Sequence, residues 1–184
     1  MAVLYGRHYS SRYRAIAELI SPGSTVLDLC CGPGVLYRRY LHDKSVNYTG
    51  LDINAKFIKM LVRCGAQGKV WDLRRDEPLP PADYVIMQAS LYHFLPNPMP
   101  LVVRMLAAAR TALIITEPIR NVADSTLPII RWIIPLLTNP GVGPQPHRFT
   151  EQSLDSFLAG SFQTEVRAFL ISGGREKIYR IAKD

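Results

Sequence analysis

The sequence predicts a doubly wound α/β domain with a mostly parallel sheet and an antiparallel hairpin at its C-terminal end. Two patterns carry this prediction. Between residues 25 and 117, short β-branched runs alternate with amphipathic stretches, which is typical of strands joined by crossover helices. Farther on, strand-like runs at 162–171 and 176–181 flank the turn Ser172-Gly173-Gly174, which favours a hairpin. The length of 184 residues and the lack of an internal repeat fit a single domain over 1–184.

Each element of this alternation has a local signal. Apolar, β-branched runs predict strands at 25–30, 46–52, 68–71, 83–88 and 112–117. Amphipathic spacing predicts helices at 9–19, 36–41, 55–63, 99–109 and 151–158. Thr150 is the expected N-cap of the last helix. The segment 74–81 is short and rich in proline, so we expect a loop where a crossover helix would otherwise pack.

Composition indicates a globular protein that folds in a reducing compartment. Apolar residues make up 48% of the chain and charged residues 20%, which excludes disordered and collagen-like classes. Cys30, Cys31 and Cys64 lack the spacing of a disulfide framework or a zinc site, so we expect a cytoplasmic protein without structural metal. No secretory signal is recognised. The most apolar stretch, 127–137, contains an arginine and a proline and is too short to span a membrane.

The net charge of +7 lies entirely in the first part of the chain. Residues 1–75 hold 12 Lys and Arg against 5 Asp and Glu, whereas residues 76–184 hold 10 of each. Most of the excess falls in segments with helical spacing, so a solvated helix surface is the favoured interpretation. The alternative is a positive field that attracts an anionic substrate or nucleic acid. No basic run interleaved with aromatic residues supports nucleic acid as a partner.

The strongest local signal is the segment VLDLCCGPG, residues 26–34, where a strand runs into a glycine-rich loop ahead of a helix. Gly32 and Gly34 let the backbone approach a ligand closely, and the helix N-terminus behind them favours partial negative charge. A nicotinamide dinucleotide motif would need a third glycine where this chain has Tyr37. The segment therefore indicates ligand binding but disfavours NAD.

Carboxylates follow three successive predicted strands. Asp28 lies in the first strand, Asp52 ends the second, and Asp72 follows the third. The carboxyl ends of parallel strands share one edge, where ligands bind at the switch point. Asp52 comes 18 residues after Gly34, where an acid that accepts hydrogen bonds from both hydroxyls of a ribose belongs. The alternative for Asp52 and Asp72 is an ordinary helix-capping role.

Together these features resemble the class I S-adenosylmethionine (SAM)-dependent methyltransferases, specifically the small-molecule type. VLDLCCGPG resembles the first motif, GLDIN the ribose motif, VWDL the adenine-side motif, DYVIMQASLYHF the strand-four motif and IITEP the strand-five motif. The resemblance runs from residue 25 to 118, and REKIYRIAK resembles the final antiparallel strand. It implies a Rossmann-like, seven-stranded methyltransferase sheet with SAM as the cofactor. The family's Gly-Gly turn before strand five is replaced here by AARTAL.

The resemblance also implies roles for single residues. Asp28 would orient the loop or reach the amino group of the methionine moiety, Asp52 would hold the ribose, and Asp72 would accept from the adenine amine. Cys30 stands where the family usually has a glycine, which is tolerable if only the backbone there meets the cofactor. The complete expected set of cofactor-binding residues is Asp28, Cys30, Gly32, Gly34, Asp52, Ile53, Asp72, Leu73, Gln88 and Ala89.

The candidate general bases are His93 and His147, because histidine titrates close to neutral pH and can take a proton from a hydroxyl or an amine. For His93, packing against the cofactor or the backbone is the favoured alternative. For His147 a loop-fixing role is equally supported. The residues expected to contact the acceptor are Tyr5, Tyr9, Tyr92 and Arg148. Tyr5, Tyr9 and Tyr13 recur every four residues, which equally fits helix packing against the sheet.

Residues 119–148 form a long insertion whose apolar part is too large to leave facing water in a monomer. A lid over the acceptor is the favoured interpretation. A homodimer interface and attachment to a membrane surface are the alternatives.

The sequence thus predicts a SAM-dependent methyltransferase that acts on a partly apolar small molecule. The stretch Gln88-Ala89-Ser90-Leu91 lacks the motif that amino-methylating nucleic-acid enzymes carry, so nucleic acid is an unlikely acceptor. The competing hypothesis is a non-catalytic SAM-binding or assembly protein.

Overall fold

The computed structural model describes residues 9–119, 148–159, 162 and 164–183, and its centre is a seven-stranded sheet in the order β3-β2-β1-β4-β5-β7-β6. The first five strands pair in parallel: β1 (Thr25–Leu29), β2 (Asn47–Asp52), β3 (Gln67–Val70), β4 (Ala82–Gln88) and β5 (Ala109–Pro118). The hairpin of β6 (Val166–Ile171) and β7 (Glu176–Ala182) completes the sheet, with β7 antiparallel to both β5 and β6. The predicted fold class is confirmed.

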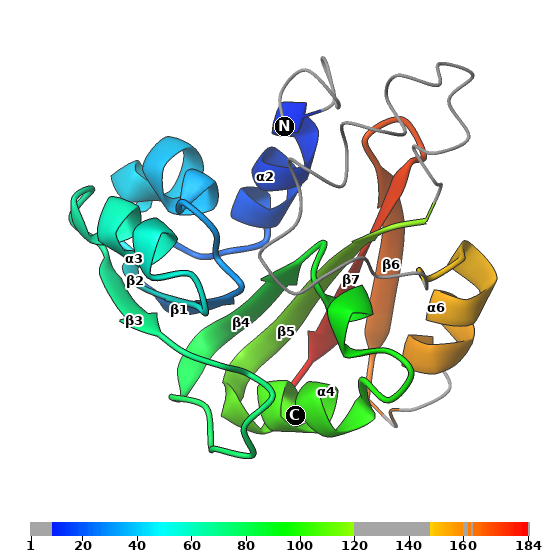
Figure 1. Cartoon of the computed structure of the whole chain (residues 1–184). Coiled ribbons are helices and arrows are strands. Elements are labelled where there is room, and N and C mark those ends of the chain that lie inside the picture. The colour runs from blue at the N-terminus through cyan, green and yellow to red at the C-terminus, as the bar shows by residue number, and fades with distance from the viewer. Residues whose placement is uncertain (1–8, 120–147, 160–161, 163, 184) are drawn as a thin grey trace, which may run out of the picture.

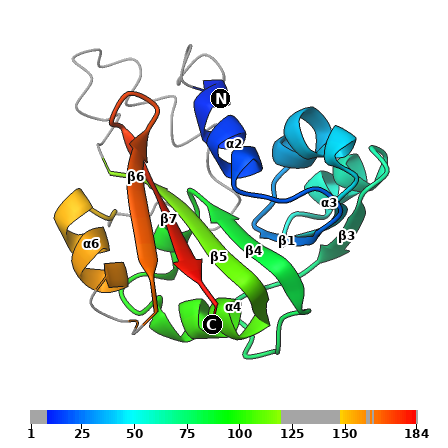
Figure 2. The same ribbon diagram turned by 180° about the vertical axis from the view of Figure 1, so that it is seen from behind.

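Helices cover both faces of the sheet (Figures 1 and 2). One face packs against α2 (Tyr9–Glu18), the short π-helical segment η2 (Tyr37–Leu41) and α3 (Ala55–Val62). The other face packs against the 3-10 turn η4 (Leu91–Phe94), α4 (Met99–Ala108) and α6 (Glu151–Ala159). A further 3-10 turn, η3 (His42–Lys44), leads into β2.

Strand alternation divides the core into two clusters. Successive side chains of a strand point to opposite faces, so Val26 joins the cluster under α2 and α3 while Leu27 joins the cluster under α4 and α6. In β4, Ile86 and Met87 divide in the same way. Because both faces are covered, β1 and β4 bury apolar side chains at successive positions rather than at every second one.

Several predicted element boundaries shift in the structure. The helix expected at 36–41 is mostly π-helical, and β5 begins at Ala109 rather than at 112. The hairpin loop has four residues, because Ile171 pairs with Glu176. Thr150 is the N-cap of α6 as predicted, since its hydroxyl accepts from the Ser153 N–H at 3.1 Å. The predicted loop between β3 and β4 is also confirmed, with no helix over 71–81.

A buried ion pair joins the first described helix to the last strand. Arg12 of α2 donates through Nε to Glu176 of β7 at 2.7 Å and through Nη2 to the second carboxylate oxygen. Both side chains are buried. Ser172, in the hairpin loop, lies 2.9 Å from Ser11 through their hydroxyl oxygens. These contacts hold α2 at the edge of the sheet where β5 ends.

Several sequence expectations fall outside the described residues. These are Tyr5, His147 and all but the first and last residues of the predicted lid at 119–148, together with the side chain of Tyr9. Within the described ranges, no helix is long and apolar enough to cross a membrane, and no group of three or more His, Cys, Asp or Glu residues could hold a metal ion.

Two glycine substitutions separate steric crowding from backbone strain. A Cβ on Gly50 of β2 would lie 2.7 Å from Cys31 Sγ and would also meet Leu61, whereas a Cβ on Gly32 meets no atom within 4 Å but sits at φ +56°. We expect Gly50→Ala to lower the free energy of unfolding by about 2–3 kcal/mol through overpacking. Gly32→Ala should lower it by about 1 kcal/mol through strain alone. Urea unfolding measures both, and equal losses would contradict this account.

Candidate functional site

The glycine-rich turn after β1 is held in a left-handed backbone conformation. Cys30, Gly32 and Gly34 have φ values of 54°, 56° and 71°. A Cβ on Gly34 would lie 2.5 Å from Leu61 of α3, so this glycine lets the turn pack tightly against the helix. Gly32 faces open space instead. The turn is therefore closed on its α3 side and accessible at Gly32.

Asp52, the last residue of β2, fastens this turn to the neighbouring loop. One carboxylate oxygen accepts from the Gly32 N–H at 2.9 Å, and the other accepts from the Asn54 N–H at 2.8 Å. Asn54 in turn is the N-cap of α3. The sequence predicted that Asp52 would lie beside the glycine loop, and the structure shows that it also holds the loop in place.

Asp28 is the centre of a buried polar network at the carboxyl end of β1. Its carboxylate accepts from the Tyr48 hydroxyl of β2 and from Gln88 Nε2 of β4, the latter at 3.0 Å. The side chain is 1% exposed, and burial raises the pKa of Asp28 to about 7, with hydrogen bonds from Tyr48 and Gln88 opposing the shift. Gln88 Oε1 is buried and has no hydrogen-bond partner among the described residues.

Glu117, near the end of β5, is a site residue that the sequence analysis missed. Its Oε1 accepts from the backbone N–H groups of Ser90 and Leu91 at 2.8 and 2.7 Å, which fixes the turn between β4 and η4. No described residue donates to Oε2. Burial raises the pKa of Glu117 to about 7, and the two N–H groups oppose the shift. A carboxylate that interrupts the apolar run ALIITEP at the ligand-binding edge is the signal that could have revealed it.

Cys30 and Ala89 belong to the same edge of the sheet. The Cys30 thiol is surrounded by the acids of the edge, and burial together with the charges of Asp52 and Asp28 raises its pKa, so it stays protonated. Ala89 follows β4 with φ 46°, and its N–H donates to the Thr116 carbonyl at 2.7 Å. Both residues thus have strained left-handed backbones directly after two neighbouring strands, β1 and β4.

The third predicted acid, Asp72, lies apart from this cluster. Its carboxylate accepts from the Arg74 backbone N–H at 3.0 Å and from Arg74 Nε and Nη2 at 2.9 Å each. These contacts lower the pKa of Asp72. Leu73 is buried against α4, whereas Ile53 is exposed. Trp71 links the loop after β3 to the end of β2, because its backbone N–H donates to the Asp52 carbonyl at 3.0 Å.

Tyr92, His93 and Arg148 lie together beyond the end of β4. The rings of Tyr92 and His93 are 4.1 Å apart, and the Arg148 guanidinium lies 3.9 Å from the centre of the Tyr92 ring. Tyr92 is buried and His93 half-buried. Burial lowers the pKa of His93, and the charge of Arg148 adds to this effect. Three of the residues expected to act on the acceptor are thus brought together.

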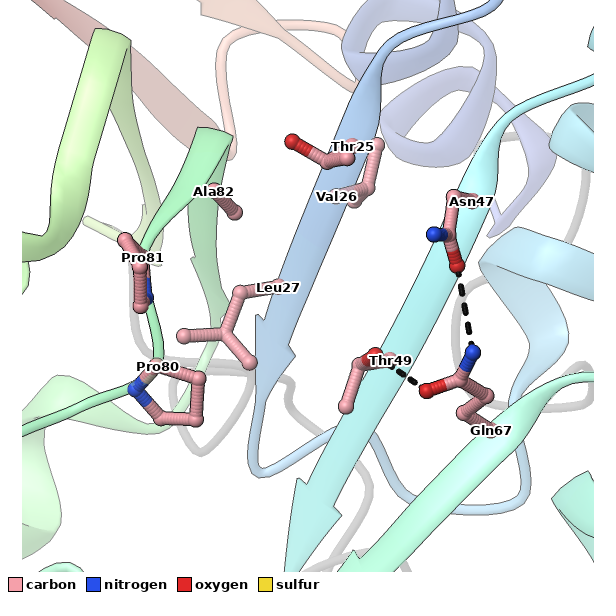
Figure 3. A pocket seen from close by; sticks show the side chains of 9 residues that line it. All are labelled: Thr25, Val26, Leu27, Asn47, Thr49, Gln67, Pro80, Pro81 and Ala82. Atoms are coloured by element: carbon pink, nitrogen blue, oxygen red, sulfur yellow. Dashed lines mark hydrogen bonds between the residues drawn. The ribbon is translucent and has the colours of Figure 1, made fainter.

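A shallow hollow lies at the opposite end of the sheet (Figure 3). It is lined by the first residues of β1, β2, β3 and β4, which are Thr25, Asn47, Gln67 and Ala82. Ligands of parallel α/β sheets bind at the carboxyl ends of the strands. This hollow is therefore not the candidate site.

The sheet order, the antiparallel β7 and the acids around the glycine turn define a class I SAM-dependent methyltransferase fold. Among solved structures, the chain is similar to the magnesium protoporphyrin IX methyltransferase of Synechocystis with bound SAH, at 18% identity and a TM-score of 0.65 over 92% of this chain and 78% of that chain. A SAM-dependent methyltransferase from Aquifex aeolicus is 15% identical, with a TM-score of 0.63 over 94% and 89% of the two chains. The [4+2]-cyclase SpnF is 19% identical, with a TM-score of 0.62 over 89% and 61%.

The sequence matches the family of the methionine biosynthesis protein MetW over residues 10–121, which is more than half of the chain, and the protein belongs to this family. No curated protein sequence matches the chain.

The raised pKa of Asp28 predicts how stability depends on pH. A buried carboxyl that resists ionisation stabilises the fold below its ordinary pKa of 3.8, and this stabilisation is lost as the pH rises through about 7. In the wild type, the free energy of unfolding should fall between about pH 5 and about pH 7.5. We expect this fall to be smaller by about 2 kcal/mol in Asp28→Asn. Urea unfolding at both pH values measures the effect, with exposed Asp43→Asn as the control. An unchanged pH dependence in Asp28→Asn would contradict the assignment.

Proposed function

We propose that this protein binds SAM at the carboxyl ends of β1, β2 and β4 and transfers its methyl group to a small-molecule acceptor. The observation that carries the proposal is the group of buried carboxylates at this edge, Asp28, Asp52 and Glu117, around a glycine turn that is open at Gly32. No Lys or Arg among the described residues forms an ion pair with any of the three. A ligand with ammonium and sulfonium groups suits such a site, whereas a pyrophosphate would be repelled.

The residues present fit this cofactor. The open space at Gly32 allows close approach to the backbone, and the unpartnered Gln88 Oε1 can accept from an amino group. Asp52 would hold the ribose hydroxyls with the lone pairs that its two backbone contacts leave free. The remaining proposed contacts are Asp28, Cys30, Gly34 and Ala89 toward the methionine end, and Ile53, Asp72 and Leu73 toward the adenine.

The bound cofactor would supply an electrophilic methyl group on a good leaving group. The protein then needs to position the acceptor and exclude water. Burial lowers the pKa of His93, which favours the neutral imidazole, and this ring would take a proton from a hydroxyl or an amine of the acceptor. Tyr92 offers an apolar surface, and the exposed Arg148 stacked on it would bind an anionic group of the acceptor.

The second candidate function is a non-catalytic one, in which the protein binds SAM and assembles with a partner or a second copy of the chain. Exposed apolar residues on the edge strand β6 favour it, since Phe169 and Leu170 are 39% and 54% exposed. The likeness to a [4+2]-cyclase shows that the fold alone does not define the chemistry. For either function we propose a cytoplasmic protein, because Cys30, Cys31 and Cys64 are free.

Cofactor binding is tested by calorimetry with SAM, SAH and NAD. We expect SAM and SAH to bind and NAD not to bind. Asp52→Ala should weaken SAH binding about 10- to 100-fold, because it removes the ribose acceptor and releases Gly32. Asp43→Ala, which removes an exposed acid in η3, is the matched control. Wild-type affinity in Asp52→Ala would place the ribose elsewhere, and binding of NAD alone would refute the proposed cofactor.

Methyl transfer is tested with SAM labelled in its methyl group and the small-molecule fraction of a cell extract as the source of acceptor. A methyltransferase converts SAM to SAH and labels a small molecule, and we expect His93→Gln and Arg148→Gln each to lower this rate at least about tenfold. Both variants should bind SAH as the wild type does. SAH binding without any labelled product would favour the non-catalytic function.

A further inference from the structure

The connection between β3 and β4 is the part of the cofactor edge that no crossover helix supports. Residues 71–81 form a loop that contains Pro78, Pro80 and Pro81. Prolines have no N–H group, and a loop has no ladder of hydrogen bonds to satisfy its carbonyls. Yet this loop carries Asp72 and Leu73, the residues assigned above to the adenine.

One side chain from outside the loop donates hydrogen bonds to its carbonyls. Arg104, in the middle of α4, donates through Nη2 to the Leu73 carbonyl at 2.5 Å, and through Nη1 to the Glu77 carbonyl at 3.0 Å and to the Arg75 carbonyl. Its side chain is 17% exposed. Among the described residues its one charged partner is Asp76, which is 4.0 Å away and fully exposed. Arg104 therefore acts mainly on the backbone of the loop.

Asp72 is the first residue of a turn, and two of the carbonyls that Arg104 contacts belong to this turn. The Arg75 N–H donates to the Asp72 carbonyl at 3.1 Å, which closes this turn, and Arg104 holds the carbonyls of Leu73 and Arg75 from the other side. The Leu73 side chain is buried in the cluster that contains Leu101 and Met105 of α4. Leu73 is thus fixed to α4 by its side chain and by its carbonyl.

We propose that Arg104 is a positioning residue for the adenine-binding loop, replacing the missing crossover helix; this inference rests on the proposed function. A guanidinium has five donors in a rigid planar fork, which lets one side chain hold three carbonyls at once. A lysine ammonium is a point charge on a flexible stem and cannot reproduce this geometry. Arg104 would act on the adenine only through the loop, whose carbonyls at Leu73, Arg75 and Glu77 it holds.

The test compares Arg104→Gln and Arg104→Lys with Arg110→Gln. Arg110 also carries one positive charge, is exposed, and lies 3.9 Å from Asp83 at the opposite end of the sheet. The first measurement needs no cofactor. Trypsin cleaves after arginine, and Arg74 and Arg75 are exposed in the loop. We expect cleavage at these two sites, followed by mass spectrometry, to be at least about tenfold faster in Arg104→Gln than in the wild type and unchanged in Arg110→Gln.

The second measurement is the ratio of affinities for SAH and S-inosylhomocysteine, in which oxygen replaces the adenine amine. The wild type should prefer SAH. Arg104→Gln should weaken SAH binding about tenfold and bring this ratio close to one, with Arg104→Lys intermediate. A residue that only stabilised the fold would weaken both ligands equally.

Each outcome decides the inference. Faster cleavage together with a reduced ratio in Arg104→Gln supports it. Wild-type cleavage at Arg74 and Arg75, or an equal loss of both ligands, overturns it. If Arg104→Gln does not fold, the same two readouts in Arg104→Lys decide. A wild-type protein that binds neither ligand would refute the proposed function, and with it the adenine role, whereas the cleavage measurement would still show whether Arg104 holds the loop.

Discussion

The paired hydrogen bonds of Asp52 are the interaction on which the ligand-binding edge depends. Two loops from different strands meet there, and each contains a backbone N–H that no strand or helix can satisfy. A single carboxylate accepts from both, at Gly32 and Asn54. This arrangement fixes the glycine turn relative to the start of α3, whose Leu61 in turn packs against Gly34. The shape of the edge therefore depends on the buried carboxylate of Asp52 and on the side chain of Leu61, which fits there because residue 34 is a glycine.

The same edge concentrates negative charge in a place where water cannot screen it. Burial raises the pKa of Asp28 and of the Cys30 thiol; the charge of Asp52 adds to both shifts, and that of Asp28 adds to the shift of Cys30. Burying like charges together destabilises a fold, and sites that do so commonly bind ligands of opposite charge. The hydrogen bonds from Tyr48 and Gln88 offset part of the cost for Asp28.

Local patterns were sufficient to predict the strands, the antiparallel hairpin and the position of Asp52, because period-two apolar runs and glycine turns act over a few residues. The contacts of Glu117 with Ser90 and of Arg104 with Leu73 could not be predicted, because they form only after β4 and α4 pack. The predicted helix at 36–41 becomes π-helical for a similar reason: its geometry is set by packing under α2 rather than by propensity. Predictions for His147 and the lid remain predictions.

The ion pair between Arg12 and Glu176 has a consequence for the order in which the chain folds. During synthesis, the carboxylate partner of Arg12 emerges 164 positions after it. A desolvated arginine without its partner is unfavourable, so α2 cannot dock in its native place on a nascent chain. The β5 strand likewise stays at the edge of the growing sheet until β7 arrives beside it. The α2 helix and the strand β5 thus reach their native surroundings only after the hairpin of β6 and β7 has been synthesised.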